Sequence, residues 1–545
     1  MNKIHLKQLF LCSISPMLLA CGSMQDAGHY GPNPHSNAPQ AYPEQAAQDA
    51  ASFPDEPEPE QANGPNGDKY EAPGTNPYVI TASDPQSTFA VDVDTASYDI
   101  FRRDINHGYL PNEDSVRLEE FVNYFPYDYA QPTHDSATPF AITVDAATNP
   151  YTPGTTLLSV GIKGQKIPPH MKKPANLVFL VDVSGSMSGP HKLPLVKKVF
   201  SEALNVLDPT DTVSIVSYAG HTAVRLEPTP VAEKGTITAV LNSLSSGGGT
   251  AGSSGINLAY EQAEAGFIDD GINHVVLCTD GDFNVGQSSD SDLVDLITEK
   301  RKSGITLTVL GFGSGNLNDS MMEKITNAGN GVYGVIANLD QAINYVHKRL
   351  LSTILLIAKD VKFQIEFNPE LVYGYRLLGY ENRALADHQF LDDTVDAGEV
   401  GAEHTVTALY ELVLAGDELP TVENAPEVQD NGLSDLVLDV NPNELCLIKI
   451  RYKHMEATEQ DPATQINRPL DATMIHESLE DASPNLQWAS AVAAFAEILK
   501  GSPYGSLDNL ETIQSMIEEH AGADADRLEF TSLLNLSIEL MTNSE

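Results

Sequence analysis

The chain has 545 residues, which is too many for one core, so we expect several domains. Its 76 Asp and Glu residues outnumber its 31 Lys and Arg residues, and the formal net charge is −45 at pH 7. Such a polyanion repels phosphates, so the composition argues against nucleic acid as a partner and is typical of a soluble, exported protein.

Residues 1–20 have the pattern of a secretion signal. Two lysines supply a positive start, and the apolar stretch 9–20 that follows is too short to span a bilayer. It ends in Leu-Leu-Ala-Cys-Gly, which resembles a bacterial lipobox with Cys21 as the lipidated residue. Because Gly22 rather than Asp follows, the resemblance implies the outer membrane of a Gram-negative cell envelope. The alternative is an ordinary signal with a chance cysteine at its end.

Residues 21–77 are rich in Pro, Gln, Asn, Asp and Glu and contain almost no aliphatic side chains. Such a segment cannot bury enough apolar surface to fold. We therefore expect a flexible tether, with contact to the membrane through the lipid anchor only.

Residues 78–135 are predicted to form a small N-terminal α/β module with one strand and two helices. The run 92–97 superficially resembles a calcium loop. An EF-hand, however, needs an oxygen ligand where Ala96 stands and a glycine where Ser97 stands. We interpret the polar residues of this run as the cap of the helix that follows.

Strand-like runs in 136–170 are followed by an alternation of strands and helices over 171–357, which predicts an α/β domain with a doubly wound, mostly parallel sheet. The predicted strands are 176–183, 211–220, 274–280, 305–313 and 331–337. The predicted helices are 190–207, 253–267, 290–303, 317–329 and 339–357.

Strand-like runs return over 358–455. We expect them to pair with 139–164 in an antiparallel β-sandwich, so that the α/β domain is inserted between strands of the sandwich. Residues 456–483 are predicted to be a linker, and 484–545 a helical C-terminal region.

Oxygen-bearing side chains follow the predicted strands of the α/β domain. Asp182, Ser184 and Ser186 follow the first strand, Thr250 follows a glycine run, and Asp280 ends a later strand. Open parallel sheets bind ligands at the carboxyl ends of their strands, so we expect these side chains to meet. They are oxygen ligands of the kind that Mg²⁺ prefers, and the glycines before Thr250 would let the backbone approach closely. The alternative is that these residues only cap helices.

The order D-x-S-x-S, then Thr, then Asp resembles the metal-ion-dependent adhesion site of von Willebrand factor type A domains, which have a Rossmann-like fold. The resemblance implies that Asp182, Ser184, Ser186, Thr250 and Asp280 hold Mg²⁺ or Mn²⁺. With few direct carboxylates, the ion would stay electrophilic and accept an Asp or Glu carboxylate of a partner protein. The flanking sequences, such as AVAAFAEILKGSPY, resemble a family of bacterial lipoproteins that contain such a domain.

Enzymatic motifs are missing from the sequence. GSMSGPHK has the wrong spacing for a phosphate loop, GFGSG lacks the dinucleotide-binding spacing, and no nucleophile elbow surrounds Ser184 or Ser186. Cys278 and Cys446 lie in apolar runs and are predicted to be buried free thiols. We therefore expect a non-enzymatic, lipid-anchored binding protein. One alternative is a structural or scaffolding lipoprotein in which the metal only stabilises the loops. The other is a hydrolase with its site in the N-terminal or C-terminal module, although the sequence shows no nucleophile–base constellation there.

Overall fold

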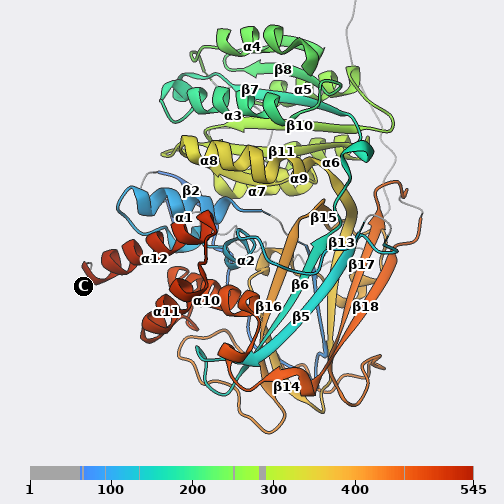
Figure 1. Ribbon diagram of the computed structural model, residues 1–545, viewed down its shortest axis with the longest axis vertical. Helices are drawn as coiled ribbons and strands as arrows, with labels where there is room; N and C mark the ends of the chain where they lie inside the picture. The colour runs from blue at the N-terminus through green and yellow to red at the C-terminus, as the bar shows by residue number, and fades with distance from the viewer. Residues whose placement is uncertain are drawn as a thin grey trace, which may run out of the picture. The chain divides into compact units, whose positions relative to one another are not determined.

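A computed structural model describes residues 62–63, 67–91, 94–133, 136–249, 252–281, 290–458 and 461–543. Cys21 and Thr250 lie outside the described residues. The described part contains an α/β domain, a two-sheet β-sandwich and a cluster of helices (Figure 1).

The α/β domain is built on a six-stranded sheet with the order β12-β11-β10-β7-β8-β9. All neighbouring strands are parallel except β8 and β9, which confirms a mostly parallel sheet. The strands are β7 (Ala175–Asp182), β8 (Thr212–Tyr218), β9 (Thr222–Pro230), β10 (Ile272–Thr279), β11 (Ile305–Phe312) and β12 (Tyr333–Ile336).

Helices cover both faces of this sheet, as a doubly wound fold requires. Successive side chains of β7 point to opposite faces, so Phe179 packs in one core and Leu180 in the other. The first face is covered by α3 (Leu193–Val206), α4 (Lys234–Ser243), α8 (Leu339–Asn344), the π-helix Tyr345–Leu350 and α9 (Leu351–Ile354). The second face is covered by α5 (Gly252–Ala265), α6 (Asp290–Arg301) and α7 (Asp319–Ala328).

Three predictions for this domain need correction. The half-exposed edge strand β9 and the helix α4 were not predicted. The helix predicted over 190–207 begins at Leu193, after a 3₁₀ turn over Gly185–Ser188. The helix predicted over 339–357 ends at Ile354, because residues from Leu356 onwards pair as a strand of the sandwich.

The sandwich consists of a six-stranded sheet, β19-β5-β6-β16-β14-β3, and a five-stranded sheet, β15-β13-β17-β18, with β4 paired to β13. Strands β6 and β13 lie directly before and after the α/β domain in sequence, which confirms that this domain is an insertion. The strands are β3 (Val79–Ile80), β4 (Gln86–Ala90), β5 (Phe140–Thr148), β6 (Thr156–Gly164), β13 (Leu356–Phe367), β14 (Val372–Leu378), β15 (Gly398–Gly401), β16 (Thr405–Leu414), β17 (Glu444–His454), β18 (Thr464–Asp471) and β19 (Ile475–His476).

The helical cluster joins segments from the two ends of the described chain. Its helices share one core, in which the buried Trp488 meets Phe125 and Phe530 at ring-centroid distances of 5.0 and 5.8 Å. The N-terminal module and the C-terminal helices are therefore one structure, although their sequences predicted two. The helices are α1 (Ala96–Asn106), α2 (Leu118–Val122), α10 (Pro484–Leu499), α11 (Leu510–His520) and α12 (Ala525–Asn543).

Two segments predicted to lack structure contain strands. The predicted linker 456–483 holds β18 and β19, which pair with β17 and β5. The predicted tether 21–77 includes β2 (Lys69–Tyr70), which pairs with β1 (Ala62–Asn63), and Tyr70 is fully buried. Both segments are polar, so their strands are not visible in the local composition, and β19 pairs with a strand that is distant in the sequence.

The polar residues before α1 do not cap that helix as predicted. Thr95 stands at the N-cap position, but its side chain makes no capping hydrogen bond. Asp94 instead accepts a hydrogen bond from the backbone N–H of Tyr333 at 2.7 Å, and Asp99 accepts one from Val335 at 3.4 Å. These carboxylates occupy backbone donors of the edge strand β12. Asp92 lies outside the described residues.

Cys278 and Cys446 are buried and free, as predicted, and burial raises the pKa of both thiols. Within the described ranges, none of the helices has the length and apolar character needed to traverse a bilayer.

A buried ion network joins the sandwich to the helical cluster. Arg376 of β14 contacts Glu411 of β16 and Glu497 of α10, each at 2.8 Å. All three side chains are at most 8% exposed. A buried charge without its partner is strongly destabilising, so this network depends on all of its members.

We predict that Arg376→Met lowers the free energy of unfolding by about 3–5 kcal/mol, because it leaves two buried carboxylates without their cation. Urea denaturation followed by circular dichroism measures the effect. The matched control is Lys166→Met, which breaks an exposed pair with Glu403 and should leave the midpoint unchanged. Equal midpoints for the two variants would contradict this account of the network.

Candidate metal centre

The first part of the site lies where β7 ends. Asp182 is the last residue of β7 and is fully buried. Its Oδ1 accepts a hydrogen bond from the backbone N–H of Ser184 at 2.7 Å. The hydroxyl oxygens of Ser184 and Ser186 lie 2.9 Å apart. Ser184 makes no helix-capping hydrogen bond, so the capping alternative does not account for this side chain.

The second part comes from β10, the neighbour of β7 in the sheet. Thr279 donates a hydrogen bond to Oδ2 of Asp182 at 3.4 Å, which connects the two strand ends. Asp280 follows it and is fully buried. Its Oδ2 accepts a hydrogen bond from Nζ of Lys192 at 2.8 Å. Its Oδ1 has no hydrogen-bond partner among the residues that the structure describes.

The third predicted ligand, Thr250, is not described, but the glycine run before it is. The N–H of Gly185 donates to the carbonyl of Gly248 at 3.0 Å, and the N–H of Gly247 donates to Val183 at 2.8 Å. The glycine run thus lies against the loop of Asp182. The predicted reason for these glycines needs correction: a Cβ at 247 or 249 would meet nothing within 4 Å. Glycine is required at Gly248 instead, because its φ of +91° is unfavourable for other residues.

The site is short of positive charge. Burial raises the pKa of Asp182 to about 6, the hydrogen bonds from Ser184 oppose this shift, and nearby Asp280 adds to it. Among the described residues, Lys192 forms an ion pair with Asp280, and no cation forms one with Asp182. A buried, unpaired carboxylate oxygen is costly unless a cation or donor reaches it. The orphaned Oδ1 of Asp280, beside a second carboxylate and two hydroxyls, fits a small divalent cation that prefers oxygen.

The side chains of the candidate centre offer oxygen ligands, which are the ligands that hard cations prefer. Over the described residues, there is no cluster of three or more His, Cys, Asp and Glu side chains that could hold a metal. The candidate centre combines carboxylates with hydroxyls, as the sequence predicted. Hydrogen bonds connect Asp182, Ser184 and Ser186, and Asp280 directly follows Thr279, which bonds to Asp182, whereas Thr250 lies outside the described residues.

Sequence reasoning missed the loop that completes the rim of this centre. We call residues 313–318 the rim loop. Its Asn316 accepts a hydrogen bond from Lys192 at 3.1 Å, and Asp68 accepts hydrogen bonds from the backbone N–H groups of Gly315 and Leu317, each at 2.8 Å. The glycine-rich run GFGSG was the one local sign of a special loop, and neither Lys192 nor Asp68 carried any recognisable motif.

Comparison with known proteins identifies the family. The von Willebrand factor type A domain family matches residues 176–349, a family described as "von Willebrand factor" matches 64–159, and "Uncharacterized protein YfbK, C-terminal" matches 352–540. The uncharacterized protein YfbK of Escherichia coli is 36% identical over 480 residues, which cover 87% of this chain and 81% of that protein. The chain belongs to the YfbK family.

Other relatives of this YfbK-family protein match less of it. The uncharacterized protein sll0103 of Synechocystis is 28% identical over 171 residues, covering 31% of this chain and 40% of that protein. A solved von Willebrand factor type A structure from Catenulispora acidiphila is 15% identical, with a TM-score of 0.41, and the match covers 75% of this chain and 89% of that one.

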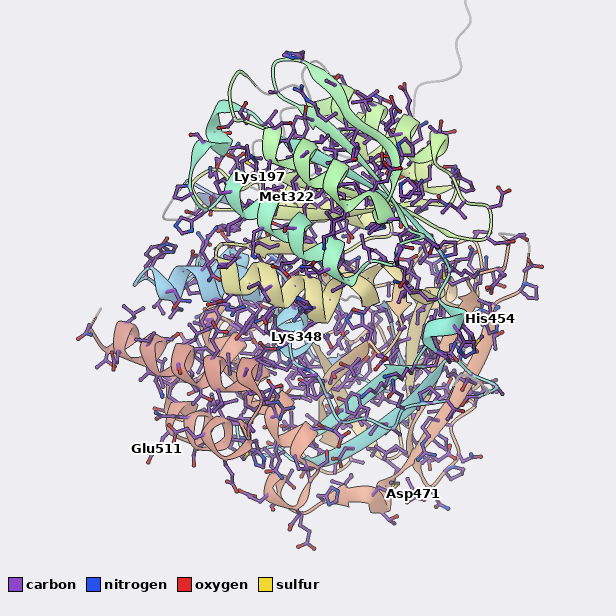
Figure 2. All side chains as sticks on the ribbon, turned by 45° about the horizontal axis from the view of Figure 1, so that its top comes forward. Lys197, Met322, Lys348, His454, Asp471 and Glu511 are labelled. Carbon is purple, nitrogen blue, oxygen red and sulfur yellow. The ribbon has the colours of Figure 1, made fainter. Side chains whose placement is uncertain are left out.

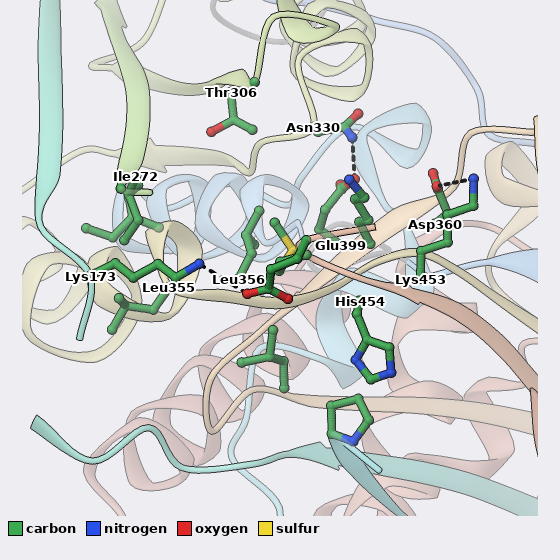
Figure 3. A pocket seen from close by; sticks show the side chains of 18 of the residues that line it. Lys173, Ile272, Thr306, Asn330, Leu355, Leu356, Asp360, Glu399, Lys453 and His454 are labelled. Atoms are coloured by element: carbon green, nitrogen blue, oxygen red, sulfur yellow. Dashed lines mark hydrogen bonds and ion pairs between the residues drawn. The ribbon is translucent and has the colours of Figure 1, made fainter. Parts of the chain in front are cut away.

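A second concave feature of this YfbK-family protein is a cleft of about 950 Å³ between the α/β domain and the sandwich (Figure 3). It lies at the amino ends of β10 and β11, marked by Ile272 and Thr306, and therefore at the opposite edge of the sheet from Asp280. Its wall carries charges of both signs, such as Lys453 and Asp360, which lie 3.8 Å apart. This mixture favours no single ligand class.

Glu399 is the most perturbed acid of this cleft. Asn330 donates a hydrogen bond to its Oε1, as Figure 3 shows. Burial raises the pKa of Glu399 well above its ordinary value, and the nearby Asp396 and Asp360 raise it further. The folded protein thus binds this proton more tightly than the unfolded chain does. Stability from this group is highest at low pH and falls as the pH rises through the folded-state pKa.

We predict that Glu399→Gln raises the melting temperature at pH 8, because the amide keeps an acceptor for Asn330 and removes a buried charge. The gain should shrink as the pH is lowered towards 5, where the wild-type carboxyl becomes protonated. Differential scanning fluorimetry between pH 5 and 8 measures it. Glu403→Gln, at an exposed glutamate, is the control. A gain for Glu399→Gln that does not vary with pH would refute the assignment.

Proposed function

We propose that this protein is a lipid-anchored binding protein of the cell envelope that holds a partner protein through a divalent cation. The cation is Mg²⁺ or Mn²⁺, and the partner offers an Asp or Glu carboxylate. The ligands are Asp182, Ser184, Ser186, Thr250 and Asp280. The observation that carries the proposal is the buried Oδ1 of Asp280, which lacks a hydrogen-bond partner among the described residues.

The donor set favours a protein-binding role for the ion. Ser184 and Ser186 supply neutral oxygens, and only two buried carboxylates balance the charge. A bound divalent cation would supply an electrophilic centre there. Mg²⁺ prefers six oxygens and keeps several waters, so an anionic side chain of a partner can replace one of them. Ser186 is exposed, so the site is open to such a partner at this point.

The matched domain supports an interaction role. The von Willebrand factor type A match covers residues 176–349, a range that includes all of the candidate ligands. The described part of this centre is built from carboxylates, hydroxyls and one lysine.

Lipid anchoring at Cys21 and an outer-membrane location belong to the same proposal. They rest on the lipobox-like sequence Leu-Leu-Ala-Cys-Gly and on the polar composition that follows it. Palmitate labelling of cells that express wild type or Cys21→Ser measures the anchoring. Label on both forms, or on neither, would contradict it.

We predict that Asp182→Asn lowers the affinity for Mg²⁺ at least tenfold, because a buried carboxylate is replaced by a neutral amide. Isothermal titration calorimetry on the full chain in detergent measures the affinity. Asp340→Asn, at an exposed position of α8, removes the same charge elsewhere in the domain and should have no effect. A wild-type protein that binds neither Mg²⁺ nor Mn²⁺ would refute the metal site.

Crosslinking in cells, with and without EDTA, separates binding from scaffolding. We expect wild type to capture a partner that EDTA and Thr250→Ala both release. If Thr250→Ala and Asp182→Asn lose the metal and lower the melting temperature but keep every crosslinked partner, the metal only stabilises the loops, and the scaffolding alternative is correct.

A further inference from the structure

Both carboxylates of the candidate metal centre are already engaged by the protein, Asp182 at both of its oxygens and Asp280 at one. Oδ1 of Asp182 accepts the backbone N–H of Ser184 at 2.7 Å. Oδ2 of Asp280 accepts Nζ of Lys192 at 2.8 Å. The first donor belongs to the backbone, whereas the second is a side chain that stands just before α3, ten residues after Asp182 in the sequence.

The side chain of Lys192 lies in a slot that the surrounding residues form. Besides Asp280, its Nζ donates to Oδ1 of Asn316 at 3.1 Å. The stem of the side chain lies against Gly313, where a Cβ would meet the Cε and Cγ of Lys192 at 2.9 and 3.0 Å. The φ of Gly313 is +83°, a backbone conformation that other residues rarely adopt. Glycine is therefore needed there both for this conformation and for the space that Lys192 occupies. The side chain of Lys192 is only 16% exposed.

The rim loop that forms this slot is itself fixed from two sides. Asp68 accepts backbone N–H groups of Gly315 and Leu317, and it pairs with the buried Arg103 at 2.9 Å. On the other side, the loop packs against Gly281, where a Cβ would meet the Cα of Leu317 at 2.4 Å. Asn316 is therefore held in position, and it holds Lys192 against Asp280.

We infer that Lys192 determines which divalent cation this site accepts. Lys192 occupies Oδ2 of Asp280 and leaves only Oδ1 for a metal. The inference rests on the proposed function, because it concerns the same metal site.

Single-oxygen ligation suits one class of cation better than another. Mg²⁺ takes six ligands in near-octahedral geometry and readily accepts one oxygen per carboxylate. Ca²⁺ takes six to eight oxygens and commonly uses both oxygens of a carboxylate. Lys192 also reduces the formal charge of the two carboxylates from −2 to −1, which weakens the attraction for any cation. The slot thus lowers the affinity for Ca²⁺ more than the affinity for Mg²⁺.

The test uses the full chain in detergent, titrated separately with MgCl₂ and CaCl₂ by calorimetry. We expect Lys192→Met to strengthen Ca²⁺ binding by about tenfold and Mg²⁺ binding by less, since a positive charge is removed and Oδ2 becomes available. The dissociation constant for Ca²⁺ divided by that for Mg²⁺ should therefore fall. Melting temperatures with each ion give an independent readout. A ligand that binds only the folded state stabilises it by an amount that grows with the logarithm of the ligand concentration divided by its dissociation constant.

The matched control is Lys197→Met, on α3 (Figure 2). Nζ of Lys197 donates to the carbonyl of Leu244 at 2.7 Å and to that of Asn242 at 3.1 Å. This substitution removes an equal charge from the helix that directly follows Lys192. It should leave the ratio unchanged. Asn316→Ala, which keeps Lys192 but removes one of its acceptors, should shift the ratio in the same direction by a smaller factor, and it carries the test if Lys192→Met does not fold.

The outcomes separate the two proposals. A wild-type protein that binds Mg²⁺, together with an unchanged ratio in Lys192→Met and Asn316→Ala, overturns the role of Lys192 and leaves the metal site intact. A wild-type protein that binds no divalent cation overturns the metal site itself.

Discussion

The insertion of the α/β domain between β6 and β13 is the constraint on which the architecture depends. These strands belong to different sheets of the sandwich, so the two connections of the domain are anchored in separate sheets. The N-terminal segment adds further attachments, because Asp94 and Asp99 bind the edge strand β12 and Asp68 binds the rim loop. The candidate metal centre therefore belongs to a domain that is fixed at several points to the rest of the protein.

Buried ion pairs make these attachments specific. Arg117, before α2, contacts Asp319 of α7 at 2.6 Å, and Arg376 joins the sandwich to α10 through Glu497. In a chain with 76 acidic and only 31 basic side chains, most carboxylates remain at the surface, and the few buried cations are all the more constrained. Burying such pairs costs desolvation energy that offsets much of their attraction, so their main effect is to penalise wrong arrangements of the modules.

The sequence predicted what depends on local pattern. Alternating apolar runs indicated the parallel sheet, and the order of Asp182, Ser184, Ser186 and Asp280 indicated which strand ends would meet. It could not predict partners that are distant along the chain, such as Asp68 with the rim loop or Lys192 with Asp280. A different limit explains the wrong linker at 456–483. The edge strand β18 pairs with its sequence neighbour β17, but its mostly exposed polar residues resemble a loop.

The net charge of −45 sets a physical condition for the proposed partner. A protein this acidic repels an acidic partner at long range, and salt screens that repulsion beyond about 8 Å. Recognition of a carboxylate must then come from local charge at the site. Asp182, Asp280 and Lys192 together carry a formal charge of −1, so a divalent cation makes the centre positive by one unit. Without Lys192, the centre with a divalent cation would have no net positive charge. It would then attract the carboxylate of a partner less strongly.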